Sequence, residues 1–334
     1  MPPPEPTSPG SPSAVGAPFV PLPGTATAFG ESPVWHAPSR SLFWVDITGR
    51  AIRRLDTATG TTRAWALPEE PGCIGLVAGE EPIGTAGSPV ALVAALRSGF
   101  HLLDLASGAL GRLTGPLFDT TRYRFNDGTV DQAGRFWAGS VFEARHEASA
   151  GLYCLERGQA RAVTGPDAPA SPQRDWGVRT SNGLAFSPDG RTMYHADTPA
   201  HTVWACDFDP ATGAIASRRT FWRASANRES PDYGGRPDGA AVDAEGCYWS
   251  AQYEGGRIVR ISPRGELLEA IAVPARCPTM VAFGGPALRT LYVTTAREGR
   301  SREELAAWPD SGSVFAAPVA VPGLPANRYR PPDG

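Results

Sequence analysis

Short apolar segments separated by turns make up most of the chain. Runs such as Ser41–Asp46 (Ser-Leu-Phe-Trp-Val-Asp) and Arg257–Ile261 (Arg-Ile-Val-Arg-Ile) are rich in aromatic and β-branched residues. Segments of this length and composition predict β-strands, and 38 Gly and 34 Pro in 334 residues are typical of a chain with many turns. The pattern therefore predicts an all-β protein built from short strands.

One pattern recurs along the chain: a small polar residue, a short apolar run, a turn and a second run that ends in aromatic or β-branched residues. The copies cover residues 31–46, 126–139, 182–197, 238–251 and 279–294, with a weaker sixth copy that begins at Cys73 and resumes at Ala91 after an insertion. Further strand pairs follow the copies, and a four-stranded unit repeated every ~40 to 57 residues is typical of a propeller blade. We therefore expect a six-bladed β-propeller, with a β-sandwich as the second choice.

The repeat also aligns a set of polar positions. Five residues before each turn the copies have Glu31, Asn126, Asn182, Asp238 and Thr279. The innermost strand of each blade borders the central channel, so equivalent positions at one end of these strands should converge around the axis. The alignment predicts that five blades direct an oxygen-bearing side chain to one place.

Carboxylates gathered near the axis are costly to bury without a compensating charge. A bound cation provides this charge, and oxygen ligands favour Ca²⁺, Mg²⁺ or Mn²⁺, although Zn²⁺ or Fe²⁺ can also be accepted. The five His residues form no close ligand pair, which argues against a histidine zinc site. The alternative is that each Asn or Asp only caps a local turn. The shared position in the repeat favours one divalent metal site.

Composition excludes several other functions. The formal charge is −3 and no dense basic run occurs, so nucleic acid is not an expected partner. All 31 basic residues are Arg, and the absence of Lys excludes a Schiff-base lysine and a P-loop lysine. The five Cys residues are far apart and are expected to be reduced core residues. No nucleophile elbow or dinucleotide-binding fingerprint is present, which leaves metal-assisted hydrolysis.

The predicted domain boundaries follow from the two ends of the chain. Residues 1–24 are dominated by Pro, Ser, Gly and Ala, and are expected to form a disordered tail. This stretch lacks the basic and apolar regions of a secretory signal, and no apolar run approaches ~20 residues, so we expect a cytoplasmic protein with no membrane contact. The propeller is predicted at 25–326 and a C-terminal tail at 327–334, in a monomer or small homo-oligomer.

The motifs resemble those of the SMP-30/gluconolactonase/luciferin-regenerating family, which includes regucalcin. Matching segments occur in family order at residues 30–35, 124–128, 131–135, 181–190, 236–239 and 281–286. The resemblance implies that Glu31, Asn182 and Asp238 are the metal ligands and that Asp238 is also the general acid/base. It further implies that Arg124 and Asn126, in the Arg-Phe-Asn-Asp-Gly motif, bind substrate. Glu143 is the nearest candidate for a third substrate-binding residue, with its spacing displaced by one position.

The resemblance implies a metal-dependent hydrolase that opens an aldonolactone to the sugar acid. The metal would polarise the lactone carbonyl, and Asp238 would exchange protons with the attacking water and the leaving alkoxide. One alternative is a paraoxonase-like or phosphotriesterase-like esterase on a similar propeller. Another is a non-enzymatic propeller that binds calcium or a protein partner.

Overall fold

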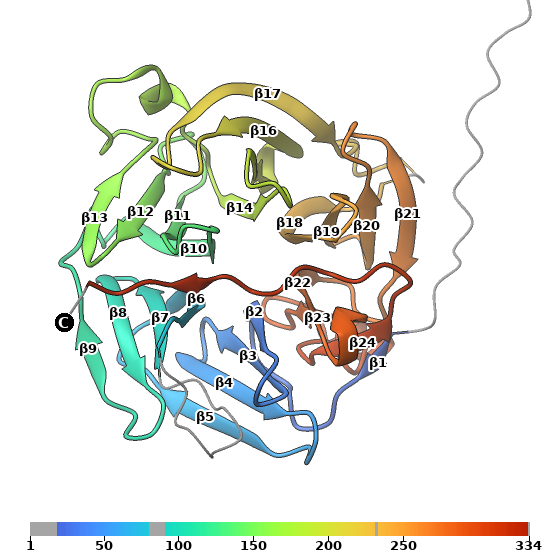
Figure 1. Cartoon of the computed structure of the whole chain (residues 1–334). Coiled ribbons are helices and arrows are strands. Elements are labelled where there is room, and N and C mark those ends of the chain that lie inside the picture. Colours follow the sequence, from blue (N-terminus) through green and yellow to red (C-terminus); the bar gives the residue numbers. More distant parts are fainter. Residues whose placement is uncertain (1–18, 80–90, 231–232, 333–334) are drawn as a thin grey trace, which may run out of the picture.

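Six β-sheets, built from antiparallel strands except for one short parallel strand, are arranged in a ring around a central channel in the computed structural model (Figure 1). The structure describes residues 19–79, 91–230 and 233–332. The prediction of an all-β, six-bladed propeller is confirmed. The insertion predicted within the second repeat falls mostly at residues 80–90, outside the described residues.

Each blade begins with its innermost strand, so the sheet order follows the chain. Blade 1 contains β2 (Gly30–His36), β3 (Ser41–Asp46), β4 (Ala51–Asp56) and β5 (Thr62–Ala66). Blade 2 contains β6 (Pro71–Val77), β7 (Ala91–Leu96), β8 (Gly99–Asp104) and β9 (Leu110–Arg112). Blade 3 contains β10 (Tyr123–Val130), β11 (Phe136–Phe142), β12 (Leu152–Glu156) and β13 (Gln159–Ala162).

Blades 4 to 6 repeat this order. Blade 4 contains β14 (Ser181–Phe186), β15 (Thr192–Asp197), β16 (Thr202–Phe208) and β17 (Ile215–Arg223). Blade 5 contains β18 (Arg236–Val242), β19 (Tyr248–Tyr253), β20 (Arg257–Ile261) and β21 (Leu267–Ala272). Blade 6 contains β22 (Pro278–Gly284), β23 (Thr290–Thr295), β24 (Phe315–Pro318) and the N-terminal strand β1 (Val20–Pro21). The described helices are the short 3-10 turns η1 (Pro172–Asp175), η2 (Thr198–Ala200) and η3 (Pro286–Leu288), and α1 (Arg302–Ala307).

Both ends of the chain join the propeller, which differs from the predicted boundaries. Val20 pairs with Ala316, so β1 closes blade 6 with a strand from the predicted N-terminal tail. At the other end, β25 (Arg328–Tyr329) pairs in parallel with β6, and Tyr329 is fully buried. The described part of the propeller therefore extends from residue 19 to residue 332 rather than from 25 to 326. No described helix is long and apolar enough to cross a membrane.

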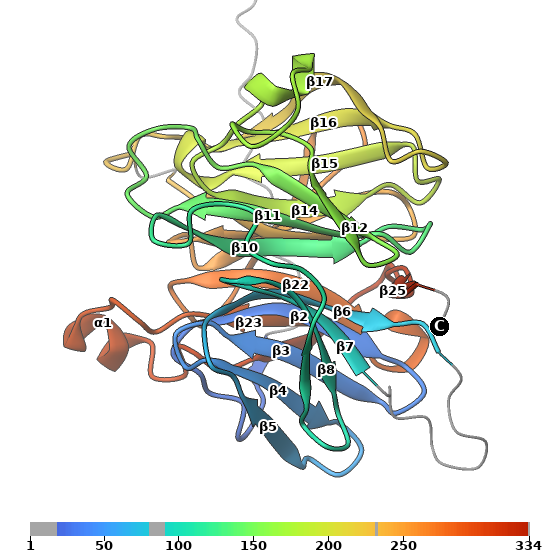
Figure 2. The same cartoon turned by 90° about the vertical axis from the view of Figure 1, so that its left-hand side faces the viewer.

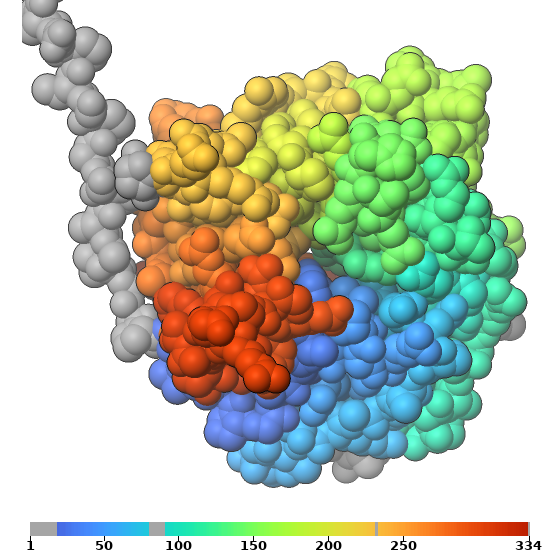
Figure 3. Space-filling model, turned by 180° about the vertical axis from the view of Figure 1, so that it is seen from behind, coloured from blue at the N-terminus to red at the C-terminus, as the bar shows by residue number. Residues whose placement is uncertain are grey.

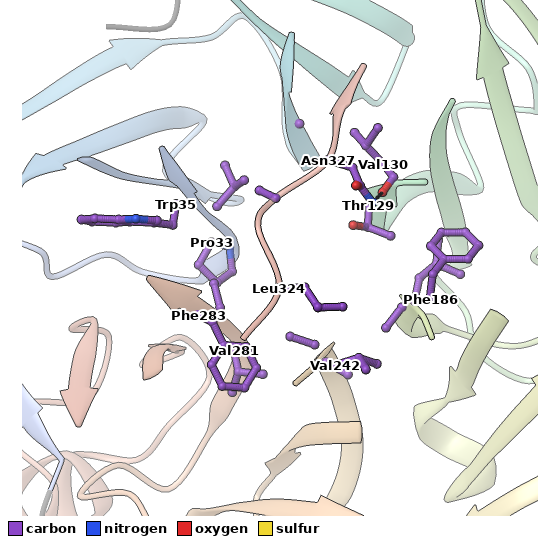
Figure 4. A pocket seen from close by; sticks show the side chains of 18 of the residues that line it. Pro33, Trp35, Thr129, Val130, Phe186, Val242, Val281, Phe283, Leu324 and Asn327 are labelled. Carbon is purple, nitrogen blue, oxygen red and sulfur yellow. Dashed lines mark hydrogen bonds between the residues drawn. The ribbon is translucent and has the colours of Figure 1, made fainter. Parts of the chain in front are cut away.

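The C-terminal segment crosses one end of the central channel before it reaches blade 2 (Figure 1). Under it lies a cavity of about 350 Å³ lined mainly by apolar side chains, including Trp35, Phe186 and Leu324 (Figure 4). Asn327 anchors the segment because its amide donates to the Val130 carbonyl over 3.0 Å. Helix α1 projects from the opposite end, on the other side from β25 (Figure 2). Figure 3 views this opposite end, where the surface is hollowed near its centre.

Apolar side chains fill the space between neighbouring blades. Phe100 of blade 2 packs on Phe125 and Phe136 of blade 3, with ring centroids 4.9 and 5.7 Å apart. All five Cys residues are buried and unpaired, as the sequence predicts. This packing holds the six inner strands in fixed positions around the channel, and the site described next lies on them.

Candidate metal and substrate site

A β-bulge interrupts each inner strand where it pairs with the second strand of its blade. The pairing shifts between Glu31 and Val34, between Asn182 and Ala185, and between Pro237 and Ala240, with corresponding shifts in blades 2, 3 and 6. A bulge bends its strand and changes the direction of nearby side chains. The aligned polar positions of the sequence repeat lie at these bulges. The repeat therefore encodes both the strands of a blade and the bulge in its inner strand.

The bulge of blade 4 requires a glycine. Gly183 has a φ of 59°, in the left-handed region that favours glycine, and a Cβ at this position would collide with the Tyr248 hydroxyl. That hydroxyl donates to the Gly183 carbonyl over 2.8 Å, which ties blade 4 to blade 5 directly after Asn182. Blade 1 has Ser32 at the equivalent position, with a φ of 48°. The backbone beside two of the predicted metal ligands is thus locked by neighbouring contacts.

Four of the five aligned residues line one cavity of about 80 Å³: Glu31, Asn126, Asn182 and Asp238. All four are buried, and Asp238 is 4% exposed. The fifth, Thr279, does not line the cavity, because its hydroxyl donates to the Gly30 carbonyl over 2.6 Å and joins blade 6 to blade 1. The expectation that five blades contribute to one place is therefore wrong for blade 6.

Hydrogen bonds between blades orient the amides of the cavity. The Asn126 amide donates to Asn182 Oδ1 over 2.8 Å and to the Ser181 carbonyl over 2.9 Å. The Asn182 amide donates to Thr198 Oγ1 over 2.7 Å. Since the amide nitrogen of Asn182 is held by Thr198, its Oδ1 is the atom that faces Asn126 and can use its second lone pair for a ligand.

Two carboxyl groups are buried in the cavity lining, and a third, that of Asp127, is buried close behind it. Burial, with Asp238 and Asp127 close by, raises the pKa of Glu31 well above its ordinary value. Burial and the neighbouring Asp127 likewise raise the pKa of Asp238 well above its ordinary value. Burial raises the pKa of Asp127 to about 7. Among the described residues no donor forms a hydrogen bond with the Asp238 carboxylate, so this group lacks the partners that normally accompany a buried charge.

Asp127 was not selected from the sequence, although it stands in the Arg-Phe-Asn-Asp-Gly motif. Its two carboxylate oxygens accept the backbone N–H groups of Gly128 over 2.7 Å and Leu184 over 2.9 Å. Asp127 therefore joins blade 3 to blade 4 and does not line the cavity. Its position directly after Asn126, equivalent to Ser32 after Glu31, is the signal that could have identified it.

Of the predicted substrate-binding residues outside the aligned set, Arg124 lines the cavity and Glu143 does not. Burial lowers the pKa of Arg124 to about 10, and its Nη1 donates to Asn126 Oδ1 over 2.9 Å. Glu143 is held by Arg97 over 2.9 Å and its nearest oxygen is 3.9 Å from Arg124 Nε. Arg97 thus binds the Glu143 carboxylate outside the cavity. From there Glu143 interacts electrostatically with Arg124.

The cavity also contains residues that sequence reasoning missed. These are Phe29, Arg145, Thr180, Thr198, Pro199, Arg236 and Tyr253. Phe29, Thr180 and Arg236 each precede an aligned polar residue by two positions, as Arg124 does. Side chains two residues apart on a strand point to the same side, so counting back two more positions in the repeat would have found them.

The oxygen atoms of Glu31, Asn182 and Asp238 form a donor set that suits a hard divalent cation. No group of three His, Cys, Asp or Glu side chains placed to hold a metal ion occurs in the described part of the chain. A metal at this cavity would therefore depend on the amide oxygen of Asn182 as its third protein ligand. The buried carboxylates of Glu31 and Asp238 have no paired cation among the described residues. They fit a bound metal ion, because a cation removes the cost of their burial.

The chain is similar to a known protein family over most of its length. Residues 29–297 match the family model described as the SMP-30/gluconolactonase/LRE-like region. A 6-deoxy-6-sulfogluconolactonase from Pseudomonas putida is 46% identical over 300 residues, which cover 89% of this chain and 93% of the relative. An L-arabinolactonase from Azospirillum brasilense is 33% identical and covers 92% of this chain and 94% of the relative.

A solved structure has the same architecture. It is described as a calcium-binding protein, regucalcin, from Agrobacterium tumefaciens, and superimposes with a TM-score of 0.82 at 26% sequence identity. The superposition covers 94% of this chain and 98% of the other. The family resemblance inferred from the sequence motifs is confirmed by these comparisons, and relatives at this level of identity support a sugar lactonase.

Proposed function

The chain belongs to the SMP-30/gluconolactonase/LRE-like family, and we propose that it is a divalent-metal-dependent lactonase that hydrolyses sugar lactones to sugar acids. One observation carries the metal part of the proposal: Glu31, Asn182 and Asp238 come from three blades and line the same small cavity. The names of the lactonase relatives support the substrate class.

In this proposal Glu31, Asn182 and Asp238 hold the cation through their side-chain oxygens. When bound, a divalent cation supplies Lewis-acid polarisation of the lactone carbonyl. The amide of Asn182 is already oriented by Thr198, and Glu31 by the Ser32 backbone N–H at 3.1 Å. Side chains held in this way lose little entropy when a ligand binds.

Asp238 is the proposed general acid/base. Its side chain lines the cavity, where it can exchange a proton with a bound water or substrate. Asp238 accepts a proton from the attacking water and returns one to the alkoxide that leaves when the ester bond of the ring breaks. Arg124 is the proposed donor to the oxygen atoms of the sugar, Asn126 accepts a sugar hydroxyl through its Oδ1, and Glu143 is a positioning residue for Arg124.

A hydrolysis panel tests this proposal. Chelated protein is assayed with a pH indicator on gluconolactone, xylonolactone, arabinolactone and galactonolactone, with and without added Mg²⁺, Mn²⁺, Ca²⁺, Zn²⁺ or Fe²⁺. The proposal expects hydrolysis of at least one lactone that disappears on chelation and returns with a divalent cation. Equal turnover in excess chelator would overturn the metal dependence.

The same panel separates the alternative functions. Turnover of aryl esters or phosphotriesters without turnover of lactones would indicate an esterase on the same fold. Binding of one cation per chain with no turnover of any substrate would indicate a non-enzymatic binding protein, a possibility to which the calcium-binding structural relative gives weight.

A further inference from the structure

The cavity lining is built in two layers. The deeper layer contains the aligned residues Glu31, Asn126, Asn182 and Asp238, and the second layer contains the residues two positions earlier, Phe29, Arg124, Thr180 and Arg236. Two residues along a strand span about 6.6 Å, so the second layer stands about one sugar length from the first. The equivalent residues in blades 2 and 6, Glu70 and Cys277, do not line the cavity.

The second layer carries excess positive charge. Arg145, on the turn after β11, lies at the cavity beside Arg124 and Arg236. No ion pair or side-chain hydrogen bond of Arg145 occurs within the described residues. Glu254 is 2.9 Å from Arg236, but this one carboxylate also serves Arg228 at 3.2 Å and Arg300 at 3.7 Å.

Two buried donors of this layer have no partner. The Thr180 hydroxyl and Arg236 Nε are buried and form no hydrogen bond within the described residues. Buried donors are nearly always paired in folded proteins, and these two belong to residues that line the cavity, so they add unmet donor capacity to its lining. A guanidinium group and a hydroxyl together suit an oxyanion with several acceptor oxygens.

The conformation of Arg145 is also unusual. Its φ of 55° places it in the left-handed region that non-glycine residues seldom adopt, while its N–H donates to the Phe142 carbonyl over 2.9 Å. Here the turn brings a free guanidinium group to the cavity.

We infer that Arg145, Thr180 and Arg236 form an anion subsite that binds a tetrahedral oxyanion, a sulfonate or a phosphate, carried by the lactone at the end remote from its carbonyl. This inference rests on the proposed lactonase function. A divalent cation at Glu31 and Asp238 would balance those two carboxylates, and the arginines of the second layer would then face the substrate with their charge largely uncompensated. The subsite therefore selects anionic lactones over neutral ones.

The test compares three lactones of the same ring: gluconolactone, its 6-phosphate, and the derivative with a sulfonate on C6. The wild-type protein is expected to show a kcat/KM at least ~10-fold higher for one of the anionic lactones than for gluconolactone, because only the anion forms ion pairs with these arginines. The preference between the sulfonate and the phosphate identifies the oxyanion.

Arg145→Gln is the main variant, since its side chain has no internal partner to leave behind. It should lower the ratio of kcat/KM for the anionic lactone to that for gluconolactone by ~10- to 100-fold. Arg122→Gln is the matched control, because Arg122 pairs with exposed Glu147 over 3.3 Å and does not line the cavity. This control should leave the ratio within twofold of wild type.

Calorimetry with the sulfonated sugar acid and with gluconate gives a second readout that does not need turnover. Tighter binding of the sulfonated acid that is lost in Arg145→Gln supports the subsite, even if no lactone is hydrolysed and the proposed function fails. Equal kcat/KM for neutral and anionic lactones, or an Arg145→Gln variant that binds both acids as wild type does, would overturn the subsite and leave the lactonase proposal standing.

Discussion

Replacement of Asp238 by Asn should make the chelated protein more stable and less active. The side chain is 4% exposed, and no described residue donates a hydrogen bond to its carboxylate. Folding raises the pKa of this carboxyl above its ordinary value of 3.8 because burial and the nearby Asp127 disfavour its charge. An amide of the same shape has no charge to bury.

The direction in which the free energy of unfolding changes with pH follows from proton binding to the folded and unfolded states. Above pH 4 the unfolded chain releases the proton of Asp238 while the folded protein retains it, so this group destabilises the folded protein increasingly as the pH rises. Each unit by which folding raises a carboxyl pKa costs about 1.4 kcal/mol at a pH above the folded pKa. We therefore expect Asp238→Asn to increase the free energy of unfolding by about 1 to 4 kcal/mol at pH 7 and by little at pH 4.5.

Activity should change in the opposite direction. Loss of a general acid/base lowers turnover by about 100- to 10,000-fold. Denaturant unfolding in excess chelator at pH 4.5 and 7 measures the first effect, and lactone hydrolysis with saturating cation measures the second. Asp310→Asn, an exposed substitution, is the control and should change neither. A chelated Asp238→Asn protein that is less stable than wild type at pH 7, or one with wild-type turnover, would refute the reasoning.

Two further predictions concern stability away from the cavity. Burial lowers the pKa of His195 to about 3. The stability that its neutral form provides is therefore complete above pH 6.5 and is lost as the pH falls towards 3. Between pH 7 and 5 the free energy of unfolding, measured by urea titration, should drop by about 2 kcal/mol more in wild type than in His195→Gln. Parallel pH curves would contradict this. Tyr329→Ala should cost about 3 to 5 kcal/mol because its fully buried ring holds the C-terminal segment, whereas Tyr329→Phe should cost about 1 kcal/mol, the value of the hydrogen bond from the Gly158 N–H. Equal thermal midpoints for both Tyr329 variants would show that the ring does not anchor the segment.

The sequence allowed the blades to be predicted because each one repeats a strand pattern with a fixed turn. It could not reveal how the ring closes, since β1 and β25 are two residues long and carry no periodicity of their own. Their pairing depends on where β24 and β6 lie in the assembled ring. The predicted N-terminal and C-terminal tails therefore included residues that belong to the propeller.

The candidate site was predicted where one residue per blade has the same position in the repeat, as with Glu31 and Asp238. Thr279 has that position too, but its short hydroxyl is satisfied by the next blade, which a sequence pattern does not show. Arg145 is on a turn outside the repeat, and only the folded chain brings it to the cavity. Arg236 could have been found by following the strand period two residues further.

Calorimetric titration of chelated protein with a divalent cation tests the central proposal most directly. If Glu31, Asn182 and Asp238 hold one ion, the wild-type protein should bind one cation per chain, and Glu31→Gln should bind it at least ~100-fold more weakly because one of two anionic ligands is lost. Binding of the same strength and stoichiometry in wild type and in Glu31→Gln would contradict the account.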